Sequence, residues 1–209
     1  SVAELKGRSV NLVELSVSHY LLARALDTAG LSEKDLTLVN TSDADIAAVF
    51  TADPNGAAVT WNPPLAQALK APGANLVFDS SRIPGEILDL LVVRTDAPDP
   101  LKKALTGAWY ETLALMNGSG PQSDAALAWM ASSSGATVDE FKAQLLTTAM
   151  FNTGADGARF AASPEVGTTM DKVRLFTFNK GLLGQGAASA DVIGIQLDDG
   201  SVLGNKDNV

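Results

Sequence analysis

Residues 11–30 read Asn11-Leu-Val-Glu-Leu-Ser-Val-Ser-His-Tyr20 and then Leu21-Leu-Ala-Arg-Ala-Leu-Asp-Thr-Ala-Gly30. The apolar run at the start of this stretch predicts a buried strand over residues 9–15. Ser16 and Ser18 are residue types that favour a helix N-cap, and apolar residues then recur at helical spacing. Gly30 is typical of the position just after a helix end. The stretch therefore predicts a strand that leads directly into a helix.

This junction concentrates polar groups at one point. The first turn of the expected helix, Ser16-Val-Ser-His19, presents backbone N–H groups, two hydroxyls and an imidazole. In an open parallel sheet such a turn lies outside the carboxyl ends of the strands, where small ligands bind. The junction therefore indicates a site for a small polar molecule, without indicating that the molecule is transformed.

The composition excludes several classes of function. Of the 209 residues, 46% are hydrophobic and 19% are charged, which is ordinary for a globular protein. The net charge of −9 argues against a nucleic-acid partner, because phosphates are bound mainly by Lys and Arg. No apolar run approaches the roughly 20 residues that span a bilayer. The chain has no cysteine and one histidine, His19, so we expect neither a metal centre nor a bound cofactor.

The first half of the chain alternates between strand and helix patterns. Further strands are expected at residues 35–40, 56–61 and 74–78, with helices at residues 41–50 and 63–70 between them. Strands separated by helices of about ten residues are typical of βαβ units and a parallel sheet.

The pattern changes after a last long apolar strand, expected over residues 86–93. From residue 100 to about residue 184 almost everything is helical. We therefore predict an α/β fold with a parallel ligand-binding lobe over residues 1–93 and the mainly helical part of another lobe over residues 94–209. The second half offers too few strands to cover its apolar helical stripes, which indicates that a segment completing this lobe is missing.

Several motifs resemble periplasmic solute-binding proteins of ABC importers for nitrate, sulfonate, taurine and pyrimidine precursors. They are Leu5-Lys-Gly-Arg-Ser-Val10, Ser16-Val-Ser-His-Tyr-Leu-Leu-Ala-Arg-Ala-Leu26, Ser42-Asp-Ala-Asp-Ile46, Trp61-Asn-Pro63 and Gly194-Ile-Gln-Leu-Asp-Asp-Gly200. Three others resemble the subgroup associated with urea carboxylase, whose proposed cargo is urea or guanidine: Val13-Glu-Leu-Ser-Val-Ser-His19, Asp79-Ser-Ser-Arg-Ile-Pro-Gly-Glu86 and Gly204-Asn-Lys-Asp-Asn-Val209.

The resemblance implies a two-lobed periplasmic-binding-protein-like architecture, a periplasmic location, a small solute and a membrane permease as partner. It also implies that the chain lacks the first βαβ segment of the N-terminal lobe, so that a contact with another chain could cover the incomplete lobe. Two alternatives stay open: binding of an oxyanion such as sulfonate, nitrate or taurine, and a small-molecule enzyme on the same fold. The sequence contains no P-loop, dinucleotide fingerprint or cysteine that would support the enzyme alternative.

Seven residues are candidate ligand contacts: Glu14, Ser16, Ser18, His19, Asp43, Trp61 and Glu86. Each also has a structural interpretation. The three residues of the helix turn and Asp43 suit helix caps or packing, Trp61 suits the core, and the two glutamates suit ion pairs. The other tryptophans of the helical stripes, Trp109 and Trp129, are expected in the core, and Arg24 on a solvated helix face.

The charges of the candidate site favour one class of ligand. Glu14 and Asp43 place two negative charges near one binding point, which would repel an oxyanion. The same acids favour a planar cation or an amide-rich solute, on which Trp61 could stack. The sequence therefore predicts guanidinium or urea as the ligand, with no catalytic residues.

Overall fold

The computed structural model describes residues 1–53 and 55–209, which divide into two compact units. Unit 1 contains Ser1–Leu88 and Pro164–Val209, and unit 2 contains Asp89–Ser163. Unit 1 is therefore discontinuous in sequence. The predicted division into lobes over residues 1–93 and 94–209 is a different division from these two units, and it stays a prediction.

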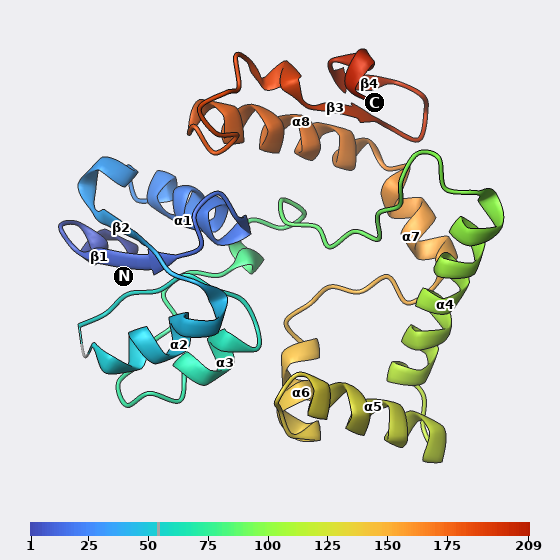
Figure 1. Cartoon of the computed structure of the whole chain (residues 1–209), viewed down its shortest axis with the longest axis horizontal. Coiled ribbons are helices and arrows are strands. Elements are labelled where there is room, and N and C mark those ends of the chain that lie inside the picture. The colour runs from blue at the N-terminus through green and yellow to red at the C-terminus, as the bar shows by residue number, and fades with distance from the viewer. Residues whose placement is uncertain (54) are drawn as a thin grey trace. The chain divides into compact units, whose positions relative to one another are not determined.

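Unit 1 opens with a β-α-β-α succession, drawn in blue to cyan in Figure 1. It consists of β1 (Ser9–Leu12), α1 (Val17–Thr28), β2 (Thr37–Asn40) and α2 (Asp43–Ala52). The two strands pair in parallel, as predicted. The third predicted strand is reduced to one parallel bridge, in which Ala58 lies opposite Asn11. The N–H of Asn11 donates to the carbonyl of Ala57, and the carbonyl of Asn11 accepts from the N–H of Val59. The segment around Ala58 therefore pairs with the edge of β1 that β2 does not occupy.

The ends of α1 follow from the residues that the sequence places there. Ser16 is the N-cap, and its hydroxyl accepts a hydrogen bond from the N–H of Ser18. At the other end Gly30 has φ +66°, and the N–H of Leu31 donates to the carbonyl of Leu26 at 2.9 Å. This is the Schellman arrangement, which a glycine after the helix permits. The apolar face of α1 packs on β1 in a core of Val10, Leu12, Leu22 and Leu26.

Two predicted strands are wrong. Residues 74–78 and 86–93, all of them described, form no strand. These runs have β-forming composition, but a strand needs a neighbour that accepts and donates its backbone bonds. Leu76 and Val77 are exposed, as are all four apolar residues from Leu90 to Val93. The helix expected at residues 63–70 is present as the short helix α3 (Pro64–Ala68), and the 3-10 turn η3 (Ser80–Arg82) lies between the two failed strands.

The second part of unit 1 consists of α8 (Pro164–Asn179) and a small antiparallel hairpin of β3 (Gly194–Gln196) and β4 (Val202–Gly204). This helix falls within the range, to about residue 184, that the sequence predicts to be mostly helical. Tyr20, Ala23, Ile83 and Leu182 form a second buried cluster, against which Phe176 of α8 packs. Short 3-10 turns complete the unit: η1 (Val2–Leu5), η2 (Glu33–Asp35), η4 (Ala190–Val192) and η5 (Lys206–Asn208).

Unit 2 is helical, as predicted. It contains α4 (Asp99–Asn117), α5 (Pro121–Ser133), α6 (Val138–Leu145) and α7 (Gly154–Ala161). Its most buried apolar side chains are Leu113, Leu127 and Ala131. The expectation that the tryptophans lie in the core is wrong: Trp129 is 71% exposed and Trp109 is 50% exposed. On α5 the buried residues 127 and 131 lie one helical turn apart, and residue 129 falls between them on another face.

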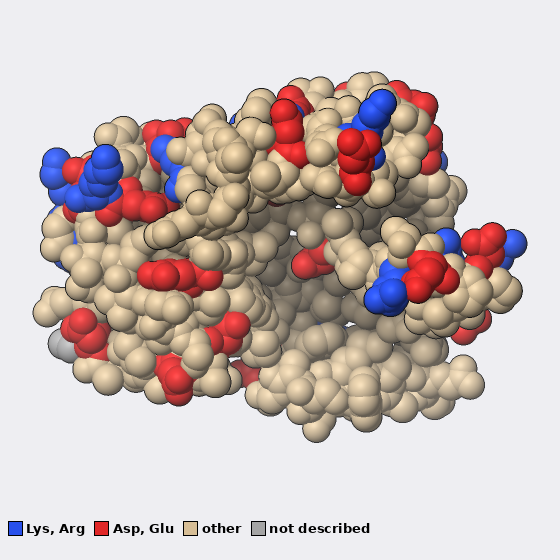
Figure 2. Space-filling view, turned by 45° about the horizontal axis from the view of Figure 1, so that its top comes forward, with Lys and Arg blue, Asp and Glu red and all other residues tan. Residues whose placement is uncertain are grey.

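None of the described helices is both long and apolar enough to cross a membrane. On the face drawn in Figure 2, acidic and basic side chains are interspersed among wide uncharged areas.

Candidate functional site

The turn between β1 and α1 lies at the carboxyl edge of the parallel sheet. The Ser16 hydroxyl donates to the carbonyl of Val13 at 2.7 Å and accepts from the N–H of Ser18 at 3.1 Å. The N–H groups of Val17 and His19 have no acceptor within the described residues. These two donors, at the positive end of the α1 dipole, are therefore not used by the described part of the chain.

Leu15, in the middle of this turn, has an unusual backbone conformation. Its φ is +58°, and no other described residue apart from glycines has a positive φ. The left-handed region costs a residue with a Cβ about 1–2 kcal/mol. Strain of this kind persists where the surroundings enforce it, and it is common at ligand sites. The Leu15 side chain is 60% exposed, so core packing does not account for the conformation.

His19 is buried below this turn, with 6% of its surface exposed. The N–H of Leu15 donates to its Nδ1 at 3.0 Å. Because a backbone N–H can only donate, Nδ1 carries no proton and the neutral ring holds its proton on Nε2. Nε2 lies 3.1 Å from Oε1 of Glu33, although neither atom has a well-oriented hydrogen-bond partner. Both ring nitrogens therefore lie next to groups of the protein.

Glu14 lies on the exposed side of the turn. Its N–H donates to Oδ1 of Asn40 at 3.1 Å, which ties the end of β1 to the end of β2. Its carboxylate has no partner within the described residues. Glu14 is thus an exposed acid two residues before the N-cap of α1.

Asn11, which the sequence analysis did not single out, joins the three segments at this edge. It is buried in β1, and its side chain donates to the carbonyl of Ala57 at 3.3 Å. Its Oδ1 accepts from the hydroxyl of Thr41, just after β2, at 2.9 Å. A polar residue inside an otherwise apolar strand was the signal that could have identified it, because such a residue needs partners when buried.

Two polar atoms at the carboxyl edge are buried without a hydrogen-bond partner within the described residues: Oδ1 of Asp43 and Oγ1 of Thr60. Asp43 begins α2 just after β2, and Thr60 follows the bridge residue Ala58. Burial raises the pKa of the Asp43 carboxyl above its ordinary value. Trp61 comes next in the chain and is 38% exposed. Unpaired buried polar atoms are rare, and a bound molecule or water is one of their explanations.

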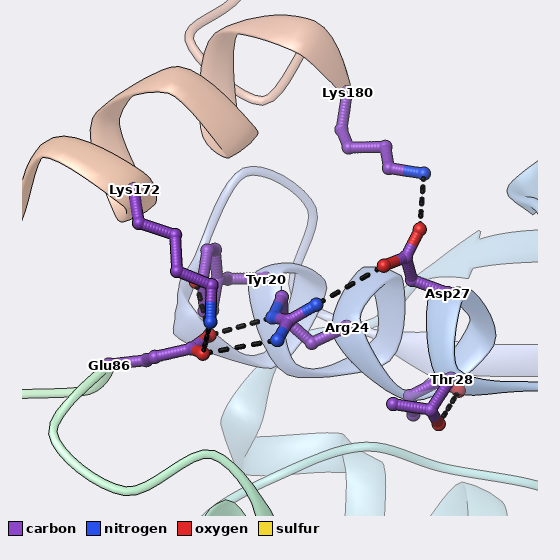
Figure 3. A network of polar contacts seen from close by, with 8 residues as sticks. Tyr20, Arg24, Asp27, Thr28, Glu86, Lys172 and Lys180 are labelled. Atoms are coloured by element: carbon purple, nitrogen blue, oxygen red, sulfur yellow. Dashed lines mark hydrogen bonds and ion pairs between the residues drawn. The ribbon is translucent and has the colours of Figure 1, made fainter. Parts of the chain in front are cut away.

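Glu86 lies in a different environment, shown in Figure 3. Its carboxylate accepts hydrogen bonds from the Tyr20 hydroxyl at 2.7 Å and from Arg24 at 2.7 and 3.1 Å. Lys172 of α8 donates to it as well. Burial alone raises the pKa of Glu86, but the bonds from Arg24, Lys172 and Tyr20 outweigh burial and bring it to about 2. Burial and the bond to Glu86 raise the pKa of Tyr20.

The expectation that Arg24 lies on a solvated helix face is wrong. Its side chain is 12% exposed, and it also contacts Asp27 at 3.2 Å. Its guanidinium carbon lies 5.0 Å from the centre of the Phe176 ring. Asp27 in turn meets Lys180 at 3.4 Å, so that the cluster joins α1 to α8 (Figure 3). Partners so far apart in the chain leave no local sequence pattern, which is why Arg24 was misjudged.

The structure thus brings Glu14, Ser16, Ser18 and His19 together in one turn. It places Asp43 and Trp61 after the two neighbouring segments of the same sheet, whereas Glu86 is bonded to α1 and α8. The two hollows described on unit 1 lie elsewhere. One of about 450 Å³ runs along α2 and α3, and one of about 210 Å³ is lined by residues that include Glu33 and Lys180. That these seven residues contact a ligand stays a prediction.

Comparisons with known proteins bear on the fold. A comparison with family models finds no match, and neither does one with curated proteins. Among solved structures, the periplasmic aliphatic sulphonate binding protein SsuA from Escherichia coli is similar, with a TM-score of 0.65 and 23% identity over 87% of this chain and 57% of that one.

The alkanesulfonate-binding protein SsuA from Xanthomonas axonopodis pv. citri, bound to MOPS, gives a TM-score of 0.62 and 21% identity over 88% of this chain and 62% of that one. The chain thus spans less than two thirds of the length of either protein. These similarities confirm the periplasmic-binding-protein-like α/β fold.

Proposed function

We propose that the chain belongs to a periplasmic solute-binding component of an ABC importer and holds a small polar solute at the carboxyl edge of its parallel sheet. The observation that carries this proposal is the β1–α1 turn, where a strained Leu15 lies between an exposed acid and two free N–H groups. The fold shared with two sulfonate-binding proteins supports it. A membrane permease would be the partner that receives the solute.

Binding accounts for this turn better than catalysis does. A general base needs a nitrogen or oxygen that is free to take a proton from the substrate. Nδ1 of His19 already accepts the Leu15 N–H, and Nε2 lies beside Glu33. The free N–H donors and hydroxyls orient a solute, and the free Glu14 carboxylate has no nucleophile hydrogen-bonded to it within the described residues.

The chemistry of these groups favours a planar solute rich in N–H donors. The free carboxylate of Glu14 and the unpaired Oδ1 of Asp43 are acceptors for such donors. The N–H groups of Val17 and His19 can donate to a carbonyl oxygen, which urea has. Trp61, which is 38% exposed, offers an aromatic ring on which a planar group can stack, and a cationic one most favourably. We therefore propose urea or guanidinium as the ligand.

A second candidate is an alkanesulfonate. The N-terminus of α1 with its free N–H groups is a typical anion site. The N-terminus of α2 also lies at this edge, next to α1 across the parallel strands β1 and β2. The two similar proteins are sulfonate-binding proteins by name. Against this stands Glu14, a negative charge two residues before the N-cap of the same helix.

Titration calorimetry distinguishes these candidates. Urea, guanidinium, an alkanesulfonate and nitrate are each titrated into the wild type, Glu14→Gln and Glu165→Gln. Glu165 is an exposed acid at the start of α8 and serves as the matched control. We expect heat with urea or guanidinium and about tenfold weaker binding in Glu14→Gln, since a charged hydrogen bond contributes about 1.5–3 kcal/mol.

Tighter sulfonate binding in Glu14→Gln than in the wild type would instead support the second candidate, because the substitution removes a repulsive charge. A wild type that gives no heat with any of the four compounds would contradict the proposed function.

A further inference from the structure

We infer that His19 is a positioning residue for the proposed site: its Nδ1 holds the backbone of Leu15 in the left-handed region and thereby shapes the turn that presents the ligand contacts. The part of this inference that concerns ligand affinity rests on the proposed function. Its structural part concerns a single hydrogen bond and can be tested without any ligand.

The chain has little room at this turn. β1 ends at Leu12 and α1 begins at Val17, so the direction reverses within four residues. The N–H groups on either side are fixed by side chains, that of Glu14 by Asn40 and that of Leu15 by His19. A glycine would adopt a φ of +58° at no steric cost, but a leucine does so only when a specific contact holds it. The bond to His19 is the contact that the structure offers.

The His19 ring is itself fixed. Only 6% of its surface is exposed. The residue belongs to the first turn of α1, and its Nε2 lies 3.1 Å from Oε1 of Glu33 in η2. Ring rotation would cost Leu15 its only acceptor. Among the described residues, Glu33 is the charged group that contacts the His19 ring. The imidazole of His19 therefore acts on a ligand through Leu15 rather than by direct contact.

Two substitutions of similar polarity separate the roles of the two ring nitrogens. The Oδ1 atom of an asparagine can take the place of Nδ1, whereas the amide of a glutamine reaches toward the place of Nε2. We expect His19→Asn to retain affinity within about threefold of the wild type, because Leu15 keeps an acceptor. We expect His19→Gln to lose about tenfold or more, because a part-buried donor is left without one.

A third variant tests the link to backbone strain. Leu15→Gly in the His19→Gln background should recover most of the lost affinity, because glycine occupies the left-handed region without help. A purely structural role of the imidazole, such as filling space, predicts no such recovery.

The experiment combines calorimetry on these variants, with whichever of urea, guanidinium or alkanesulfonate the wild type binds, and ¹⁵N NMR of the His19 ring and the Leu15 amide. We expect an unprotonated Nδ1 and a Leu15 amide that His19→Gln perturbs and His19→Asn does not. Equal loss in both variants, or a proton on Nδ1, would overturn the inference. If the wild type binds none of the solutes, the proposed function fails, while the NMR result still decides the role of His19.

Discussion

Glu14 and Glu86 are both acids of the same compact unit, and from the sequence both are candidate ligand contacts, but their surroundings differ completely. Glu86 is 8% exposed and accepts hydrogen bonds from Tyr20, Arg24 and Lys172. Glu14 is exposed, and its carboxylate has no partner in the described chain. An acid whose partners all come from the chain stabilises the fold, whereas an acid left unpaired beside free donors is available to a solute.

Replacing Glu86 should have the largest effect on the free energy of unfolding. Glu86→Ala removes the acceptor of the buried Tyr20 hydroxyl and leaves Arg24 with Asp27 alone, and breaking a buried pair in this way costs about 3–5 kcal/mol. Differential scanning calorimetry measures the loss. Glu14→Ala is the matched control and should change the unfolding free energy by less than about 0.5 kcal/mol. Equal effects of the two substitutions would contradict the distinction drawn between these acids.

The pH dependence of stability should show the same difference. The pKa of Glu86 falls from 4.5 to about 2 on folding, so its contribution is fully present above pH 4.5 and is lost as the pH falls toward 2. A shift of this size corresponds to roughly 3 kcal/mol. The unfolding temperature of the wild type should therefore drop more steeply over this range than that of Glu86→Gln. Parallel curves for the two proteins would show that Glu86 is not the group responsible.

The smallest expected effect concerns the cap of α1. Ser16→Ala removes the acceptor of the Ser18 N–H and should destabilise the protein by about 1 kcal/mol, while Ser16→Asp retains an acceptor and most of the stability. Ser42→Ala provides the comparison, because Ser42 is the N-cap of α2 without a side-chain capping bond. Thermal unfolding of the three variants measures these differences. A larger loss in Ser42→Ala than in Ser16→Ala would be the contrary result.

The part of the fold that depends on neighbouring residues was predictable. The N-cap Ser16, the terminating Gly30 and the apolar spacing between them are local signals, and α1 begins and ends almost where they indicate. The strand predicted over residues 86–93 failed because a strand is completed by a distant partner, which composition does not reveal.

The candidate site was predictable to a similar extent. The chain order of strand and helix was enough to place Glu14, Ser16 and Ser18 at one turn. The left-handed conformation of Leu15 was not predictable, because leucine rarely adopts it. The burial of Arg24 depends on Glu86, which lies 62 residues further along the chain, so that only the folded structure shows it.

The Glu86 cluster also bears on how the chain tolerates changes of length. Glu86 lies just before the chain leaves unit 1 at Leu88, and Lys172 lies just after it returns at Pro164. Their bond helps to close the long loop of chain that forms unit 2. The entropic cost of closing such a loop rises only with the logarithm of its length. Doubling the loop would cost about 0.6 kcal/mol. Insertions and deletions within unit 2 should therefore leave the folding of unit 1 almost unchanged, as long as the anchors on both sides are kept.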